Sequence, residues 1–364
     1  MTYALSYDRM LCIGKRERRC LYRSAFLEDS VKTASIMVQN LCVPCSCRCR
    51  YCLLCWDGKA VGVDWARGAA FAQRIRAWQK ENMPEAGFSF SFGYAMEPED
   101  PVQALRFLRK IGSPQAEFWQ CDGMHMRSEA ECEALAALLA REGVKHLSFT
   151  VYGQAAYHDR FAGRAGDHAL LMRMLRAACA ADLQVSVRLP LTKESAPQAD
   201  QVIGEALEKA PGVKVSLFIP HSEGRGAALE GIRFSGTDQS SLSPEAFSRL
   251  NHEIYRPEGE WLLPGAFKAE TQRMLLISLR RDNAERLEKE DAGSLIQWLE
   301  DLDERYYAAF PALPELAARY GDSSGARYFS QRDLFAYYRR LYARETGLKV
   351  YDVTDERQCG SRRY

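Results

Sequence analysis

Six of the 12 cysteines of this chain lie within fourteen residues, in the run CVPCSCRCRYCLLC that starts at residue 42. Within this run, Cys45, Cys49 and Cys52 have the spacing C-x3-C-x2-C, and Tyr51 directly precedes the third cysteine. Three thiolates on one short loop can bind three irons of a [4Fe–4S] cube, because such clusters are held by cysteine thiolates. The fourth iron is then free to bind a substrate or a cofactor. The run therefore predicts an iron–sulfur site.

Zinc binding is the alternative interpretation of the same run, which contains three C-x2-C pairs: Cys42–Cys45, Cys49–Cys52 and Cys52–Cys55. Each pair is half of a structural zinc site. Such a site usually needs a second, well-separated pair or a following H-x3-5-H, and the nearest downstream histidine is His125. The iron–sulfur interpretation is therefore favoured. The three thiols outside the C-x3-C-x2-C motif are interpreted as packed or incidental: Cys42, Cys47 and Cys55.

The overall composition is that of a globular protein. The chain has 364 residues, 47% hydrophobic and 27% charged, with a formal net charge of +1. This length suits one large α/β domain with an appendage. A net charge this close to neutral gives no indication that the protein binds nucleic acid or a membrane surface. No segment approaches a membrane span, and the N-terminal residues lack the apolar stretch of a signal peptide. Many cysteines without such a signal lead us to expect a cytoplasmic protein with reduced thiols.

Strand-like and helical segments alternate along the first two thirds of the chain. The expected strands are 34–41, 88–92, 117–121, 146–151, 184–189 and 213–219. The expected helices are 65–80, 102–110, 128–141, 167–181 and 198–209. Ser128 and Glu131 have the spacing of a helix capping box. Six β/α repeats in order predict a parallel sheet with right-handed crossovers, either doubly wound or a partial barrel.

Several of these strands alternate apolar and polar residues, so that each has one polar face. The polar positions are Ser89, Ser91, His146, Ser148, Thr150, Ser186, Arg188, Lys214 and Ser216. A strand covered on both faces would be apolar throughout. The shared polar face therefore indicates a barrel with a polar interior, and a sheet with one solvated face is the alternative. Arg188 directed into such an interior needs an anionic partner, which makes it a candidate ligand-binding residue.

The chain resembles the radical S-adenosylmethionine (radical SAM) enzymes in four features. These are the cysteine spacing, the aromatic residue before the third cysteine, the position of the loop after the first strand and the order of six repeats. The resemblance covers about residues 35–228 and identifies no subfamily. It implies an α/β fold: a partial (β/α)6 TIM-like barrel with a mainly helical C-terminal extension. We expect an N-terminal extension at 1–33, the barrel core at 34–236 and the extension at 237–364.

By this resemblance, Cys45, Cys49 and Cys52 hold a [4Fe–4S] cluster whose fourth iron binds S-adenosylmethionine. One electron from an external donor such as flavodoxin or ferredoxin would cleave this cofactor to a 5′-deoxyadenosyl radical. The radical would abstract a hydrogen atom from a small-molecule or peptide substrate. The resemblance identifies no catalytic residue for that step.

Six residues match family positions that bind S-adenosylmethionine: Tyr51, Glu97, Ser148, Thr150, Arg188 and Ile219. Tyr51 would lie against the adenine, and packing beneath the loop is its alternative role. Glu97 belongs to the run GYAMEP at 93–98, where the family has Gly-Gly-Glu-Pro. Ala95 and Met96 stand in place of the two glycines, which permit close backbone approach. The backbone of this run would hold the methionyl amino group.

The remaining cofactor contacts come from later strands. Ser148 or Thr150 would reach the ribose, and the guanidinium of Arg188 would bind the methionyl carboxylate with two hydrogen bonds. Ile219 marks the place where backbone meets the adenine. Asp122 is interpreted as part of a strand-ending turn, with a substrate contact as the alternative. The loop 221–226 would either hold substrate or form a solvated exit loop.

Beyond residue 236 we expect helices at 244–255, 284–310 and 331–346, a strand at 274–279 and a C-terminal tail. Two other functions fit the cysteine run. One is an activase that installs a glycyl radical on a partner protein, and the other is a non-catalytic binding module stabilised by zinc. An auxiliary cluster that uses Cys12, Cys20 and the surplus thiols of the loop is a further alternative.

Overall fold

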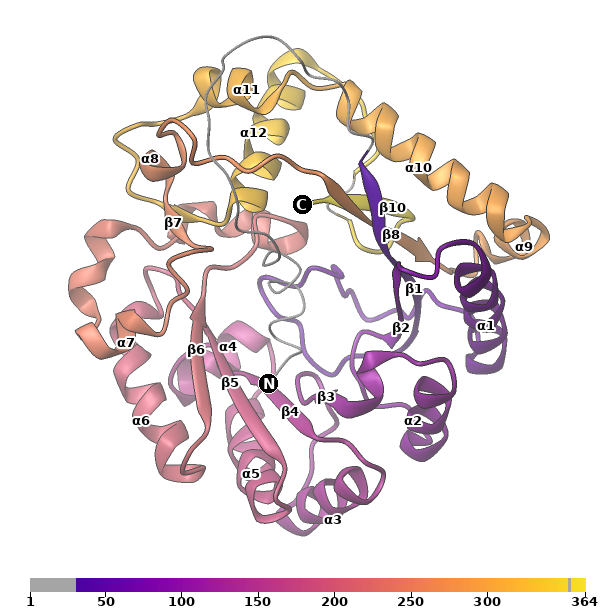
Figure 1. The fold of residues 1–364 in the computed structure, drawn as a ribbon. Helices are drawn as coiled ribbons and strands as arrows, with labels where there is room; N and C mark the ends of the chain where they lie inside the picture. The colour runs from indigo at the N-terminus through magenta and orange to yellow at the C-terminus, as the bar shows by residue number, and fades with distance from the viewer. Residues whose placement is uncertain (1–30, 353–354) are drawn as a thin grey trace.

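The computed structural model describes residues 31–352 and 355–364. Figure 1 shows strands arranged in an arc, with most of the helices of residues 65–209 along its outside and the C-terminal helices closing its upper side. The α/β fold predicted from the sequence is confirmed. Cys12 and Cys20 lie outside the described residues.

Six β/α repeats form the first part of the arc. Their strands are β1 (Lys32–Val43), β2 (Gly87–Gly93), β3 (Phe118–Gln120), β4 (His146–Thr150), β5 (Gln184–Pro190) and β6 (Lys214–Phe218). Their helices are α1 (Trp65–Asn82), α2 (Pro101–Lys110), α3 (Glu129–Arg141), α4 (Ala155–Ala162), α5 (Asp167–Ala180) and α6 (Ala199–Lys209). Every expected strand and helix of this part is present. The short helix α4 was not predicted from the sequence.

The strands form two four-stranded sheets, in the orders β10-β8-β1-β2 and β3-β4-β5-β6. All neighbouring pairs within residues 32–278 of these sheets are parallel. Parallel strands bring their carboxyl ends to one edge, and the loops that follow them meet there. The cysteine run follows β1 and therefore lies at this edge.

The C-terminal third adds two strands to the sheet that contains β1 and β2 and forms a separate two-stranded sheet. Of these strands, only the one expected at 274–279 was predicted from the sequence. The strands of this third are β7 (Arg256–Pro257), β8 (Gln272–Ser278), β9 (Tyr328–Phe329) and β10 (Gly360–Arg363). Its helices are α7 (Pro244–Ser248), α8 (Glu258–Trp261), α9 (Ala284–Lys289), α10 (Ala292–Ala308), α11 (Leu313–Tyr320) and α12 (Gln331–Thr346). β8 pairs in parallel with β1, and β10 pairs antiparallel with β8. The expected tail is thus an edge strand of the barrel sheet.

Two expectations for the C-terminal helices are wrong. The long helix expected at 284–310 is interrupted, because Glu290 is extended (φ −67°, ψ 141°) and Asp291 begins α10 by accepting a hydrogen bond from the Ser294 amide. An aspartate that binds the amide three residues on is a typical helix start. The helix expected at 244–255 ends after five residues, at Ser248. The capping box of Ser128 and Glu131 on α3 is confirmed.

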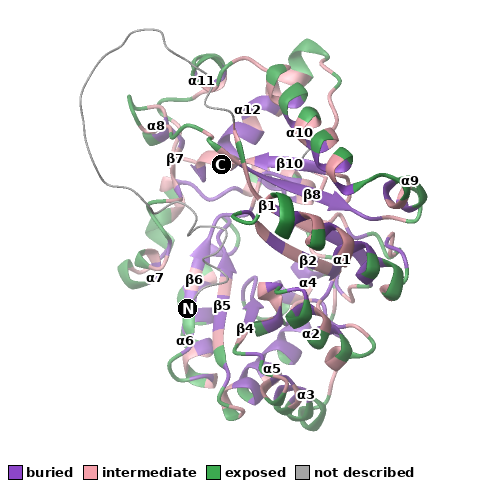
Figure 2. Ribbon diagram, turned by 45° about the vertical axis from the view of Figure 1, so that its right-hand side comes forward, coloured by how far each residue is buried: buried purple, intermediate pink, exposed green. Residues whose placement is uncertain are grey.

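The strands have one face against the helices and one face toward the interior of the arc. Alternate residues such as Phe88 and Phe90 pack with α1 and α2, while Phe149 and Val187 pack with α3 and α5. Figure 2 shows the strands as largely buried and the outer helix faces as exposed. The opposite strand face is polar, as the alternation predicted. No helix in the described ranges is long and apolar enough to span a bilayer.

Candidate functional site

The cysteine loop after β1 is held by backbone hydrogen bonds to loops that follow three other strands. The Ser46 amide donates to the Gly123 carbonyl at 3.0 Å, after β3. The Arg48 amide donates to the Ala162 carbonyl at 2.7 Å, on α4 after β4. The Arg225 amide, after β6, donates to the carbonyl of Cys52 at 3.2 Å. The loop therefore has a defined path across the carboxyl ends of the strands.

Two glycines allow these loops to come this close. Gly123 has φ +75°, and a Cβ at this position would overlap the Sγ of Cys45. Gly224 has φ +53°, and its Cβ would lie 2.8 Å from the Leu53 carbonyl oxygen and 2.9 Å from that of Cys52. A side chain at either position would be both strained and obstructed. These glycines leave the space in which the motif cysteines lie.

The sulfurs of the three motif cysteines each accept a hydrogen bond. Cys45 Sγ accepts from the Cys47 amide at 3.4 Å, and Cys52 Sγ accepts from the Trp56 amide at 3.5 Å. Cys49 Sγ accepts from the hydroxyl of Tyr152 at 3.2 Å. Such donors stabilise negative charge on sulfur, which is the form that binds iron. Other contacts act the opposite way: a hydrogen bond with the Cys47 side chain and burial raise the pKa of Cys45, and burial raises the pKa of Cys52.

The other three thiols of the run donate instead. Cys42 donates to the Phe92 carbonyl at 3.1 Å, and the Cys55 thiol lies 3.9 Å from the carbonyl of Leu53. These contacts use the sulfur-bound proton that a metal ligand gives up. They agree with the interpretation of these thiols as surplus to the motif.

Cys47 is the most deeply placed thiol of the run, with 2% of its surface exposed. It donates to Asp167 Oδ2 at 3.5 Å. Its hydrogen bond with Cys45 lowers its pKa, but its hydrogen bond with Cys49, burial and the nearby Asp167 charge raise the pKa above the ordinary value. Asp167 also pairs with His158 and Arg164. Cys47 is therefore a buried thiol that lies between two motif cysteines and forms hydrogen bonds with both of them and with Asp167.

Within residues 31–352 and 355–364, no group of three or more histidine, cysteine or acidic side chains surrounds a single metal position. In an iron–sulfur cube each thiolate binds a different iron, so the three sulfurs do not converge on one point. The donor set of the loop fits such a cluster: three half-buried thiols that accept hydrogen bonds, with room provided by Gly123.

Tyr51 lies in an aromatic cluster with its ring centroid 5.4 Å from Tyr152, 6.1 Å from Phe161 and 6.3 Å from Phe218. These rings come from the ends of β4, α4 and β6. Burial is the main cause that raises the pKa of Tyr51 above its ordinary value. Tyr51 therefore packs with three other aromatic rings of the protein, and its contact with adenine stays a prediction.

Arg188 on β5 extends beside this cluster, with its guanidinium carbon 4.6 Å from the centroid of the Phe218 ring. Among the described residues, no carboxylate forms an ion pair with it, although its side chain is half-buried. A guanidinium in that setting favours an anionic ligand. Of the predicted cofactor residues, Arg188 is the one whose charge is not already paired within the described chain.

Thr150 and Asp122 are joined to each other. The Thr150 amide and its Oγ1 donate to the two carboxylate oxygens of Asp122, each at 2.8 Å. Gln120 also donates to Asp122, and burial is the largest cause that raises the pKa of this carboxyl. Asp122 therefore closes the ends of β3 and β4 as a structural turn. Ser148 lies on the same strand face and is 4% exposed.

Glu97 ties the loop after β2 to the loop after β3. Its Oε2 accepts from the His125 amide at 2.5 Å and lies 2.9 Å from His125 Nδ1, and its Oε1 pairs with Arg127. The side chain is thus used within the protein, and the adjacent backbone is what borders the site. Ile219 is fully buried just beyond β6, and the following carbonyl of Pro220 accepts from Arg233 at 3.3 Å.

The loop after β6 is covered by α12, a contact that was not predicted from the sequence. His221 Nδ1 lies 3.0 Å from Asp333 Oδ1, and Glu223 pairs with Arg332. Burial alone would raise the pKa of Asp333, but His221 and a hydrogen bond from Ser330 hold it well below its ordinary value. This loop is therefore anchored to the C-terminal extension. No local pattern in the sequence indicated this contact, because it joins residues more than a hundred positions apart.

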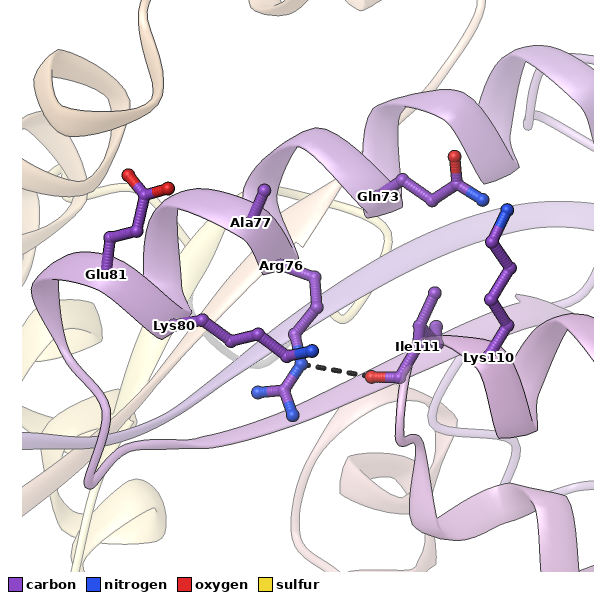
Figure 3. Close-up of a pocket in the computed structure, with 7 residues that line it drawn as sticks. All are labelled: Gln73, Arg76, Ala77, Lys80, Glu81, Lys110 and Ile111. Atoms are coloured by element: carbon purple, nitrogen blue, oxygen red, sulfur yellow. Dashed lines mark hydrogen bonds between the residues drawn. The ribbon is translucent and has the colours of Figure 1, made fainter.

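Two surface cavities lie away from these residues. One, of about 310 Å³, lies between the C-terminal halves of α1 and α2, where Arg76 Nε donates to the Ile111 carbonyl at 3.0 Å (Figure 3). These helix ends lie at the amino ends of the strands, opposite the cysteine loop. The other, of about 500 Å³, includes Trp298, Tyr351 and Cys359 in its lining. None of the predicted site residues lines either cavity.

No family model and no curated protein matches the sequence. Solved structures do match. SuiB of Streptococcus suis bound to S-adenosylmethionine is 11% identical, over 68% of this chain and 59% of its own, with a TM-score of 0.44. HemN of Escherichia coli, a coproporphyrinogen III oxidase, is 16% identical over 60% of this chain and 52% of its own (TM-score 0.40). The third structure, anSMEcpe with bound AdoMet, is 13% identical over 65% of this chain and 68% of its own (TM-score 0.41).

HemN is a radical SAM enzyme, and the SuiB and anSMEcpe structures contain bound S-adenosylmethionine. SuiB has also been solved with its precursor peptide SuiA, matched at 10% identity over 52% of this chain and 40% of that one (TM-score 0.37). The chain thus spans about half of the length of the SuiB and HemN chains. At these identities and TM-scores, a function has to be argued from the residues of this chain.

Proposed function

We propose that this chain is a radical SAM enzyme in which Cys45, Cys49 and Cys52 bind a [4Fe–4S] cluster. The observation that supports this most is that each of the three motif sulfurs accepts a hydrogen bond from the surrounding protein, next to the space that Gly123 leaves open. When bound, the cluster supplies the electron that cleaves S-adenosylmethionine to methionine and a 5′-deoxyadenosyl radical, which takes hydrogen from the substrate.

The residues of the chain orient the cofactor and exclude water. Arg188 binds the methionyl carboxylate, since its guanidinium has no ion-pair partner among the described residues. Tyr51 forms an apolar wall beside the adenine, together with the backbone at Ile219. Ser148 and Thr150 border the ribose. The backbone just before Glu97 holds the methionyl amino group. Glu97 positions this backbone, because its side chain contacts the loop after β3.

The substrate is a small molecule or a peptide, and the electron comes from a flavodoxin or ferredoxin in the cytoplasm. A glycyl-radical activase is the second enzymatic candidate, because its chemistry begins with the same cysteine motif. A glycyl EPR doublet after incubation with a candidate partner protein, S-adenosylmethionine and dithionite would select it.

Single alanine substitutions across the cysteine run test the cluster. After anaerobic reconstitution, substitution of Cys45, Cys49 or Cys52 is expected to remove most of the iron, labile sulfide and 5′-deoxyadenosine formation. Substitution of Cys42 or Cys55 is expected to leave all three quantities near the wild-type value. A colourless protein that binds zinc through the same cysteines would refute the proposal in favour of a zinc-stabilised module.

Replacement of Arg188 by methionine tests the carboxylate contact. A charge-assisted hydrogen bond contributes about 1.5–3 kcal/mol, so S-adenosylmethionine is expected to bind roughly 10- to 150-fold more weakly. Arg160→Met is the matched control, because Arg160 also lies over an aromatic ring, that of Tyr157. Equal cofactor affinity of the Arg188 variant and the wild type, measured by equilibrium dialysis at equal iron content, would exclude this contact.

A further inference from the structure

Tyr152 brings a side-chain hydroxyl to one sulfur of the cysteine motif. It follows β4 directly, is 3% exposed and donates to Cys49 Sγ at 3.2 Å. Cys45 and Cys52 receive their hydrogen bonds from backbone amides of the loop itself. Tyr152 is thus the one side-chain hydroxyl in the described residues that donates to a motif sulfur, and it comes from a different repeat.

The position of this hydroxyl is fixed by its surroundings. The ring of Tyr152 stacks on that of His158 with centroids 4.9 Å apart, and it lies 4.7 Å from Phe161 and 5.4 Å from Tyr51. Rings packed on several sides cannot change rotamer without opening a void. The ring therefore keeps its hydroxyl beside Cys49 Sγ, where the hydroxyl also forms a hydrogen bond with the Tyr51 side chain.

A hydrogen-bond chain beneath the ring fixes its backbone as well. The Tyr152 amide donates to His158 Nδ1 at 3.1 Å, so that nitrogen carries no proton. The proton of the neutral imidazole is then on Nε2, which donates to Asp167 Oδ2 at 3.0 Å. Asp167 is held in turn by Arg164. These buried contacts anchor the start of the loop after β4, and with it Tyr152.

We propose that Tyr152 is a positioning residue that sets the reduction potential of the cluster through its hydrogen bond to Cys49. The inference rests on the proposed function, since it needs a cluster at the motif. The reduced cluster carries one more negative charge than the oxidised one, and a donor to a ligand sulfur stabilises it more strongly. Loss of the hydroxyl therefore makes the cluster harder to reduce.

Tyr152→Phe removes only the hydroxyl and keeps the packed ring. Iron content is expected to remain at the wild-type level, while the midpoint potential, followed by EPR in a redox titration, shifts to a more negative value. ENDOR of the reduced wild-type cluster is expected to show one more exchangeable proton coupling than the variant, while the couplings from the Cys47 and Trp56 amides remain in both. Tyr157→Phe is the matched control, because the Tyr157 hydroxyl lies in the same aromatic cluster but contacts Glu194 at 3.1 Å.

An unchanged potential in the Tyr152 variant, or a set of exchangeable proton couplings identical to that of the wild type, would overturn the inference. A large loss of iron would also overturn it, because the hydroxyl would then be needed for assembly of the site. Failure of the proposed function is distinguishable, since the wild-type protein itself would then bind no cluster.

Discussion

Gly123 should be essential for the iron site, because it lies where the loop after β3 meets the cysteine loop. It has φ +75°, and a Cβ built there overlaps the Sγ of Cys45. Ala95 Cβ is 3.5 Å from the same point, so the new methyl group has little room on that side. The easiest relief is rotation of the Cys45 side chain, which moves its sulfur out of the motif. Gly123→Ala is therefore expected to impair cluster binding more than folding.

The free-energy cost has two parts. A residue with a Cβ in the left-handed conformation costs about 1–2 kcal/mol. An extra methyl group in a filled site typically costs about 1–3 kcal/mol. Gly123→Ala is then expected to lower the free energy of unfolding by roughly 2–5 kcal/mol.

Gly212→Ala separates these two parts. Gly212 has φ +84°, and no atom lies within 4 Å of a Cβ built on it. This variant therefore carries the backbone cost alone, about 1–2 kcal/mol. Any effect of alanine on the unfolded chain is common to both variants and cancels in their difference. Urea denaturation of the metal-free proteins gives the two free energies, and iron analysis after anaerobic reconstitution gives the cluster content.

We expect Gly212→Ala to bind iron as the wild type does and Gly123→Ala to lose most of it. If Gly123→Ala is no less stable than Gly212→Ala and binds full iron, then the contact with Cys45 does not limit the site. The reasoning from the geometry of this loop would be refuted by that result.

Four further substitutions test the C-terminal extension and the surroundings of the site. Asp303→Ala removes a fully buried carboxylate that pairs with two arginines at 2.7 and 2.9 Å and is expected to lower the free energy of unfolding by about 3–5 kcal/mol. Glu304→Ala, which removes a half-exposed carboxylate on the same two arginines, should cost less than about 1 kcal/mol in the same denaturation assay. The folded-state pKa of Asp333 lies below its unfolded value, so the stability it contributes with His221 is present above about pH 4 and declines as the pH falls further. The free energy of unfolding of Asp333→Asn should therefore be about 3–5 kcal/mol lower than that of the wild type at pH 6. This difference should shrink toward pH 3, and a difference that does not change with pH would contradict the ion pair. Cys47→Ala should retain full iron after reconstitution, and loss of the cluster would show that this thiol is a ligand.

The six repeats and the two faces of their strands were predictable because both depend on local patterns. Alternation of apolar and polar residues places Phe88 and Phe90 toward the helices, whatever the remainder of the chain does. The capping box of Ser128 and Glu131 is local in the same way. The strand β8 was expected as a strand, but its place beside β1 was not. That pairing joins Ser35 to Met274, and no pattern within either segment encodes it.

The strand β10 was missed for a different reason. Its sequence, Gly-Ser-Arg-Arg, has low strand propensity and resembles a solvated tail. It becomes a strand because β8 offers an unpaired edge and because Asp303 binds Arg363 from the neighbouring helix. A buried ion pair between distant residues is not visible in either segment by itself.

For the site, the sequence by itself determined which atoms are available for chemistry: three thiols at a fixed spacing, an aromatic residue beside them and an arginine on a polar strand face. Covalent spacing limits how far apart the thiols can lie, so this part needs no tertiary information. Only the tertiary structure decided which sulfurs accept hydrogen bonds, that Glu97 and Asp122 pair within the protein, and that α12 covers the loop after β6. These outcomes depend on groups far apart in the chain, whose hydrogen bonds and charges act only once packing brings them within a few ångströms.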